Sequence, residues 1–410
     1  MSSVEVSPPQ RGRSVAIVMS RLRRLVIPDE PWLQGLRGVL RRVAADGGTL
    51  VLAEGTAGFE FLRFGAARLG IPCRILPPPA DIGVSATALS VPDRLLIQEV
   101  DRVYALGLRP QGNIHRLLHE RLERQQGGIV LVDLPGLQPQ QVRDQLEEAG
   151  AEIWQPTAWE CRSFPVGGVF EASAAEVPET QIPETQVPET QVPATMNAGI
   201  YLIAPFPSTE GWEFLTHTTR ACPGPWPDQS FEDYAADLLE SRPEADHSPL
   251  GALRRIVLQQ KLIASGRTIR GGERVVSLTA CPLGDLPSLH RFRPHRVRWD
   301  FEPFGLCLRR EWLLKQGLRP VRYGDDADWE SLATVDRPFF QRAVGASGID
   351  WQVEQEWRVR GDLRLSELSA EDVILFVPDF ESAKSLAEVT SWPMTLWPAM
   401  GRECWPTRED

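Results

Sequence analysis

Lysine is almost missing from this chain. Only Lys261, Lys315 and Lys384 occur among 44 basic residues, and we attribute this shortage to codon usage rather than to function. The six cysteines are scattered, with no C-x-x-C pair and no histidine at metal-ligand spacing, which predicts reduced thiols and no metal site. No apolar run reaches membrane-spanning length, and residues 1–13 lack the apolar segment of a secretion signal. We therefore expect a cytoplasmic protein that does not enter membranes.

Several catalytic motifs are also missing. The chain has no G-x-S-x-G, no H-E-x-x-H, no Walker lysine and no protein-kinase set. The net charge of -11 opposes non-specific binding to nucleic acid or to anionic membranes, because both are negatively charged. A nucleic-acid partner is therefore not expected, although a local basic patch would override this charge.

A low-complexity spacer divides the chain of 410 residues. Between Val177 and Thr195 a five-residue unit recurs as Val-Pro-Glu-Thr-Gln or Ile-Pro-Glu-Thr-Gln. A proline in every unit removes backbone donors and prevents a helix, so residues 172–198 are expected to form a disordered linker. The predicted domains are residues 14–160 and 200–385, followed by a tail at 386–410.

Upstream of the spacer, helical and strand patterns alternate as in a doubly wound α/β sheet. Two predicted strands, 49–53 and 128–133, are apolar throughout, which is typical of strands buried on both faces. Further strands are expected at 72–76, 102–106 and near Ile153, and helices at 31–45, 59–69, 94–101, 114–124 and 138–148.

Two loops in this domain follow strands and open helices. One contains Gly55, Thr56 and Gly58, and the other contains Arg109, Gly112 and Asn113. Ligands of open α/β sheets bind beyond the carboxyl ends of strands, and a glycine loop at a helix start offers N–H groups to a phosphate or carboxylate. The alternative is that the glycines only form tight turns.

The same region resembles the SLOG superfamily of Rossmann-like nucleotide-binding domains. The resemblance rests on Gly55-Thr-Ala-Gly58, on Gly70-Ile-Pro72 and on the run from Asp101 to Asn113, and it covers about 14–156. It implies a nucleotide or nucleotide-derived small molecule as ligand. The phosphoribohydrolase motif G-G-x-G-T-x-x-E of related proteins is absent, so a sensing role is implied rather than catalysis.

Downstream of the spacer the sequence predicts an α+β domain, with helices at 231–240, 250–264 and 310–316. The run from Trp351 to Val359 places Glu354, Glu356 and Arg358 at every second position. As a strand, it would present these charged groups on one face and apolar groups on the other. A row of ionisable groups on a rigid strand suits a catalytic site, and the alternative is a solvated face with cross-strand ion pairs.

An ordered series of segments in this domain is similar to AbiGi-type abortive-infection proteins, which share the DarT-like ADP-ribosyltransferase fold. The similarity covers about 211–380, and its pieces are Leu215–Arg220, 250–266, Val275–Ala280, Phe304–Leu308, 320–324 and the Glu354/Glu356 run. The resemblance implies NAD as cofactor. It also implies that His217 holds a ribose, that Tyr323 lies near the nicotinamide, and that Glu356 or Glu354 supports the reacting ribose.

Each of these residues has an alternative role. His217 stands beside threonines, where a histidine often makes structural hydrogen bonds, and Tyr323 can pack at a strand end. Arg358 is expected to offer its guanidinium to the cofactor. The segment His290–Trp299 interleaves arginines with Phe292 and Trp299, which suits base stacking or pyrophosphate binding, or pairing with acidic groups of the protein itself.

The leading hypothesis is a bacterial defence or stress protein. A nucleotide-sensing Rossmann-like domain would be coupled to an NAD-dependent ADP-ribosyltransferase or NAD glycohydrolase, which acts on an acceptor that the sequence does not name. The alternative hypothesis is a non-catalytic regulatory protein in which both domains bind ligands.

Overall fold

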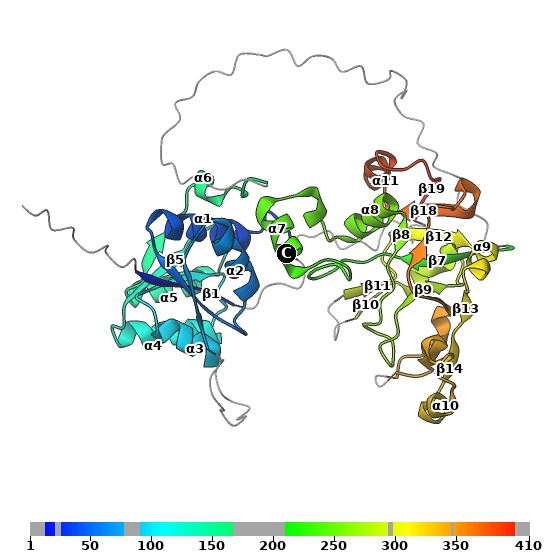
Figure 1. Cartoon of the computed structure of the whole chain (residues 1–410), viewed down its shortest axis with the longest axis horizontal. Coiled ribbons are helices and arrows are strands. Elements are labelled where there is room, and N and C mark those ends of the chain that lie inside the picture. The colour runs from blue at the N-terminus through cyan, green and yellow to red at the C-terminus, as the bar shows by residue number, and fades with distance from the viewer. Residues whose placement is uncertain are drawn as a thin grey trace, which may run out of the picture. The chain divides into compact units, whose positions relative to one another are not determined.

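The computed structural model describes residues 13–20, 26–77, 91–166, 210–293, 298–345 and 348–397 (Figure 1). The predicted linker at 172–198 lies outside these residues, as does the end of the predicted tail from 398 onward. The described chain divides into two compact units. Among the described helices, none has the length and apolar character that crossing a bilayer requires.

The first unit is built on a six-stranded parallel sheet with the strand order β3-β2-β1-β4-β5-β6, the Rossmann order. The predicted doubly wound architecture is therefore confirmed. The strands are β1 (Ser14–Met19), β2 (Thr49–Ala53), β3 (Cys73–Leu76), β4 (Arg102–Leu106), β5 (Gly128–Val132) and β6 (Glu152–Trp154). The helices are α1 (Pro31–Ala45), α2 (Phe59–Arg68), α3 (Val91–Gln98), α4 (Asn113–Glu123), α5 (Gln140–Glu148) and α6 (Ala158–Cys161).

Helices cover both faces of this sheet (Figure 1). On one face, α1 and α2 bury Leu36 and Phe61 against the strands. On the other, α3, α4 and α5 form a second core cluster, which includes Leu118. Helix α1 lies close to the strands because Gly35 has no side chain: a Cβ there would be 2.8 Å from Leu106.

Helix α7 (Phe231–Glu240) also belongs to the first unit, because Gln229–Ala245 cluster with the N-terminal sheet. The predicted domain limits placed this helix in the second domain. Its helical span agrees with the prediction, but its apolar side chains, among them Tyr234 and Leu239, join the core cluster of α1 and α2. An amphipathic stripe indicates that a helix packs on a core, and it does not indicate which core.

The second unit contains a seven-stranded mixed sheet in the order β13-β16-β9-β7-β12-β18-β19, which agrees with the predicted α+β class. Its strands are β7 (Phe214–Thr218), β9 (Val275–Thr279), β12 (Gly305–Arg309), β13 (Arg319–Pro320), β16 (Glu356–Arg360), β18 (Val373–Val377) and β19 (Met394–Leu396). Helices α8 (Pro249–Gln259), α9 (Arg310–Lys315) and α11 (Phe380–Ala387) contribute to its core.

Short elements complete the second unit. The strands are β8 (Lys261–Leu262), β10 (Arg291–Arg293), β11 (Arg298–Asp300), β14 (Arg322–Gly324), β15 (Phe340–Arg342) and β17 (Leu363–Arg364). One α-helix, α10 (Asp326–Ser331), and four 3-10 helices belong here, namely η2 (Leu283–Leu289), η3 (Arg337–Phe339), η4 (Gln352–Glu354) and η5 (Ala370–Asp372). A further 3-10 helix, η1 (Pro243–Ala245), follows α7 in the first unit.

Three sequence expectations for these segments need correction. The helix predicted at 250–264 ends at Gln259, because Gln260 adopts a left-handed conformation with φ 49° and Leu262 then pairs with Leu363. The strand predicted from Trp351 begins only at Glu356. The predicted tail contributes β19, which pairs in parallel with β18 at the edge of the sheet.

Candidate functional site

Both predicted loops of the first unit lie at the carboxyl edge of its parallel sheet and meet the end of β1. Gly58, with φ 88°, caps α2, and a Cβ there would lie 2.8 Å from Met19 Sδ, at the last residue of β1. The backbone N–H of Arg109 donates to Ser20 Oγ at 3.0 Å. Strand order reverses at β1 and β4, where open α/β sheets bind ligands.

Local geometry explains part of each loop. Gly55 has φ 85°, and the Thr56 hydroxyl donates to the carbonyl oxygen of Ala53 at 2.7 Å, so this loop is a hydrogen-bonded turn as well as a candidate site. In the other loop, Gly112 is the N-cap of α4 and supplies no side-chain cap. The first backbone N–H groups of α4, beginning at Asn113, are thereby left open to an anion.

In the second unit, the neighbouring strands β16, β9 and β7 bring the predicted histidine and glutamates to one part of the sheet. Glu356 lies opposite Thr279 on β9, and Thr279 lies opposite Thr216 on β7, directly before His217. One strand therefore separates the histidine from the carboxylates, although more than a hundred residues separate them in sequence.

His217 has a defined protonation state in this arrangement. Its Nδ1 atom is 2.9 Å from the carbonyl oxygen of Ser277. A carbonyl oxygen only accepts hydrogen bonds, so Nδ1 carries the proton. Burial lowers the pKa of His217 to about 4, against the opposing effect of this hydrogen bond, so the ring is neutral at pH 7. Its Nε2 has no partner among the described residues and is a free acceptor.

Glu356 and Arg358 share one face of β16 and form a bidentate ion pair. Nε and Nη2 of Arg358 donate to the two carboxylate oxygens of Glu356 at 2.9 and 2.8 Å. The Arg358 side chain is 1% exposed, and it also donates to the carbonyl oxygens of Pro338 and Phe340 and to Gln341 Oε1. Arg358 therefore positions Glu356. The sequence analysis expected this guanidinium to bind a cofactor, but protein groups occupy it.

Glu354 does not lie on that strand face. It ends the short helix η4, and Gln355, with φ 44°, separates it from β16. The Thr279 hydroxyl donates to the carbonyl oxygen of Glu354 at 2.6 Å and fixes this turn. The Glu354 carboxylate has no hydrogen bond or ion pair with another described residue, and burial, followed by the charges of Glu356 and Asp300, raises its pKa to about 7.

Tyr323 lies against the start of β16. Its hydroxyl oxygen accepts a hydrogen bond from the backbone N–H of Glu356 at 2.8 Å. Burial, with the nearby charges of Glu356 and Glu354, raises the pKa of Tyr323 to about 12, so the hydroxyl stays protonated. Through this hydrogen bond, Tyr323 positions the backbone of Glu356.

The sequence did not single out Arg220 and Glu302 as members of this site. Arg220 is exposed, forms no hydrogen bond or ion pair with the described residues, and acts electrostatically on His217, Glu302 and Glu354. Burial raises the pKa of Glu302 to about 7, against the Ala221 N–H and Arg220, which lower it. The position of Arg220, three residues after His217, was the available signal.

The hairpin β10–β11 borders the same group. Arg293 donates to Asp300 at 2.8 Å, and both charges act on Glu354. Phe292 and Trp299 face each other across the two strands and are about half exposed. Residues 294–297 lie outside the described residues, so four positions of the predicted basic segment have no structural account. No cluster of metal-ligating side chains is present in the described part of the chain.

Comparisons with known proteins concern the first unit. No protein-family model matches the chain, and no curated protein gives a significant match. The molybdenum cofactor carrier protein of Chlamydomonas reinhardtii shares 13% identity over 37% of this chain and 94% of its own, with a TM-score of 0.28. The molybdenum cofactor binding protein of Rippkaea orientalis shares 15% identity over 37% of this chain and 93% of its own, with a TM-score of 0.26.

DNA processing protein A of Streptococcus pneumoniae shares 12% identity over 36% of this chain and 60% of its own, with a TM-score of 0.28. Likenesses at this level carry no conclusion about ligand or activity. The Rossmann-like class of the first unit follows from its own strand order and parallel pairing.

Proposed function

We propose that the second unit cleaves the nicotinamide–ribose bond of NAD and transfers ADP-ribose to an acceptor or to water. The observation that carries this proposal is the grouping of three side chains that have free functional atoms. They are the neutral His217, the carboxylate of Glu354 and the guanidinium of Arg220, which acts on both. Among the described residues, His217 Nε2, the Glu354 carboxylate and the Arg220 guanidinium have no hydrogen-bond or ion-pair partner.

These groups match the needs of the reaction. Nε2 of His217 accepts a hydrogen bond from a ribose hydroxyl, and Arg220 pairs with a phosphate. As the bond breaks, its electron pair leaves with nicotinamide, and positive charge develops on the ribose. The fixed carboxylate of Glu356 stabilises this charge.

Glu354 completes the reaction as general base. With a pKa of about 7, the Glu354 carboxyl group is ionised in about half of the protein molecules at neutral pH. The ionised form accepts the proton of the attacking acceptor or water. The overall change is NAD⁺ plus acceptor–H to ADP-ribosyl acceptor plus nicotinamide plus H⁺.

For the first unit, the proposal is a SLOG-like sensor of a nucleotide or related phosphate ligand at the carboxyl edge of the sheet. Two independent loops at the end of β1 support it, together with the uncapped start of α4. The coupled protein would serve bacterial defence or stress responses.

The test is to incubate the purified full chain with NAD and to measure free nicotinamide and covalently attached ADP-ribose by mass spectrometry. Glu354→Gln and Glu356→Gln together should abolish both products. Glu367→Gln is the matched control, because Glu367 is an exposed glutamate of the same unit. Nicotinamide release that survives the double substitution would reject the proposal.

A second candidate, a non-catalytic binding protein, is favoured by the closed Glu356–Arg358 ion pair, since a fully satisfied carboxylate is also what a structural role requires. It predicts that NAD raises the thermal stability of the protein without turnover. Thermal shift and product analysis on the same samples separate the two candidates.

A further inference from the structure

Helix α7 connects two features of this protein that lie far apart in sequence. Gln229–Ala245 pack within the first unit, whereas the preceding residues up to Cys222, the stretch Trp226–Asp228 and the chain from Asp246 belong to the second. The chain therefore passes from the second unit into the first and back. The first anchor of the α7 segment in the second unit, Cys222, follows Arg220 of the proposed NAD site by two residues.

Apolar contacts hold α7 in the first unit. Phe61 of α2 packs against Phe231 and Tyr234, with ring centroids 5.2 and 5.9 Å apart. Leu238 and Leu239 are fully buried. The first unit therefore cannot bury the apolar surface of α2 without a segment that comes from beyond the spacer.

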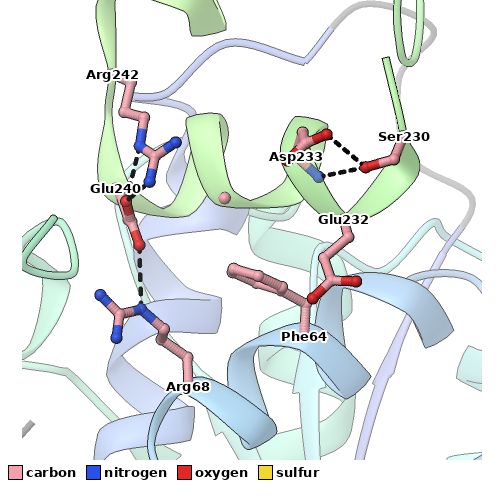
Figure 2. A pocket seen from close by; sticks show the side chains of 8 residues that line it. Phe64, Arg68, Ser230, Glu232, Asp233, Glu240 and Arg242 are labelled. Atoms are coloured by element: carbon pink, nitrogen blue, oxygen red, sulfur yellow. Dashed lines mark hydrogen bonds and ion pairs between the residues drawn. The ribbon is translucent and has the colours of Figure 1, made fainter. Parts of the chain in front are cut away.

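Buried polar contacts make this docking specific. Arg37 of α1 is 2% exposed and donates to the carbonyl oxygens of Leu239 and Leu238 at 3.0 and 2.6 Å, and to Ser241 Oγ at 2.8 Å. Arg68 of α2 donates to Glu240 at 3.1 Å, and Arg242 donates to the other oxygen of the same carboxylate, as Figure 2 shows. The Glu240 side chain is 2% exposed.

Helix α2 reaches from α7 to the proposed ligand loop. It begins immediately after Gly58, which touches the end of β1, and its following turns carry Phe61, Phe64 and Arg68. Phe64 and Arg68 also line a groove of about 310 Å³ between α2 and α7 (Figure 2). The loop at Gly58 is therefore continuous with the helix on which α7 rests.

The base of the docked segment is fixed within the second unit. The backbone N–H of Cys222 donates to the carbonyl oxygen of His247 at 2.9 Å, and the buried His247 ring stacks on Trp226 at 4.2 Å. Arg255 of α8 pairs with Asp228 at 2.8 Å and lies over the Trp226 ring. These contacts hold Cys222, Trp226 and Asp228, which precede α7, and His247, which follows it, within the second unit.

We propose that α7 couples the two units, so that the state of the Gly55–Gly58 loop sets the position of Arg220 and hence the affinity for NAD. This inference rests on the proposed function of the second unit. Coupling is reciprocal, so NAD bound in the second unit must also change the stability of α2 and α7 in the first. Effects of this kind usually change affinity by about 5- to 150-fold.

The test uses hydrogen–deuterium exchange of the full chain with and without NAD, and NAD affinity is measured by calorimetry on the same samples. We expect NAD to change exchange of the amides of α2 and α7. A Gly-Ser-Gly-Ser insertion after Gly224 slackens one side of the docked segment and should reduce this change while NAD is still bound. The same insertion after Thr190, within the repeat, is the control and should leave the change intact.

Two outcomes would overturn the coupling. If NAD binds and exchange in α2 and α7 stays the same, the second unit has its proposed ligand and α7 does not couple it to the first. If calorimetry detects no NAD binding, the proposed function fails and the coupling fails with it.

Discussion

Replacing Glu354 by glutamine tests the central chemical claim, because it removes one ionisable group and keeps the shape of the side chain. Burial and two neighbouring carboxylates raise the pKa of Glu354 from 4.5 to about 7. The folded protein therefore binds this proton more tightly than the unfolded chain. The stabilising contribution is present below pH about 4.5 and is lost as the pH rises through about 7.

The size of the effect follows from the shift. A change from 4.5 to about 7 corresponds to at most about 3 kcal/mol, since one pKa unit is worth about 1.4 kcal/mol. Relative to the wild type, Glu354→Gln should gain stability as the pH increases from 5 to 8. Urea unfolding followed by tryptophan fluorescence measures this gain, because ten of the thirteen tryptophans lie after the spacer. Glu302 also has a pKa of about 7, but it is present in both the wild type and Glu354→Gln, so its titration does not contribute to the difference between them.

The same variant should lose activity. Nicotinamide release by the wild type should rise with pH through about 7 as Glu354 loses its proton, and Glu354→Gln should be slower by about 10²- to 10⁴-fold. The control Glu367→Gln should retain the wild-type rate and pH profile. A variant Glu354→Gln that is as active as the wild type, or a stability difference that does not change with pH, would refute the assignment.

Three further substitutions test individual contacts. Arg220→Gln should raise the KM for NAD about 10- to 150-fold in steady-state assays, since a charge-assisted contact is worth about 1.5–3 kcal/mol. The exposed control Arg364→Gln should not raise it, and equal KM values for Arg220→Gln and the wild type would exclude phosphate binding by Arg220. Arg358→Met should lower the free energy of unfolding by about 3–5 kcal/mol, and Glu356→Gln in the same chain should restore part of it; an additive double variant would contradict the ion pair. Arg37→Met should make α7 sensitive to limited proteolysis, and unchanged cleavage around Gln229 would show that Arg37 does not hold α7.

The sequence was sufficient for most of the first unit because its signals are local. Apolar strands such as Thr49–Ala53 and helix boundaries such as Pro31 are determined by neighbours in the chain. The location of α7 depends instead on which core fits Phe231 and Tyr234. Both rings pack against Phe61, more than 150 positions earlier in the chain, and periodicity within the helix carries no information about that contact.

The candidate site divides in a similar way. Strand alternation placed Glu356 and Arg358 on one face, and the ion pair between them agrees with this. Arg220 ends the segment Leu215–Arg220, and Glu302 lies in no segment that the sequence analysis singled out. They come together only because β7 pairs with β12, which starts three residues after Glu302, and no pattern within either segment predicts this pairing.

Glu354 and Glu356 have different environments in the structure, although the sequence pattern treats them alike. A period of two assigns Glu354 and Glu356 the same role, but the left-handed conformation of Gln355 breaks that period. Glu356 is thereby fixed by Arg358 and, at its backbone N–H, by the Tyr323 hydroxyl. Glu354 is left half-buried with no partner among the described residues and with a raised pKa. A reaction that needs one fixed negative charge and one mobile proton requires this division, and a uniform strand of paired carboxylates would supply only the first.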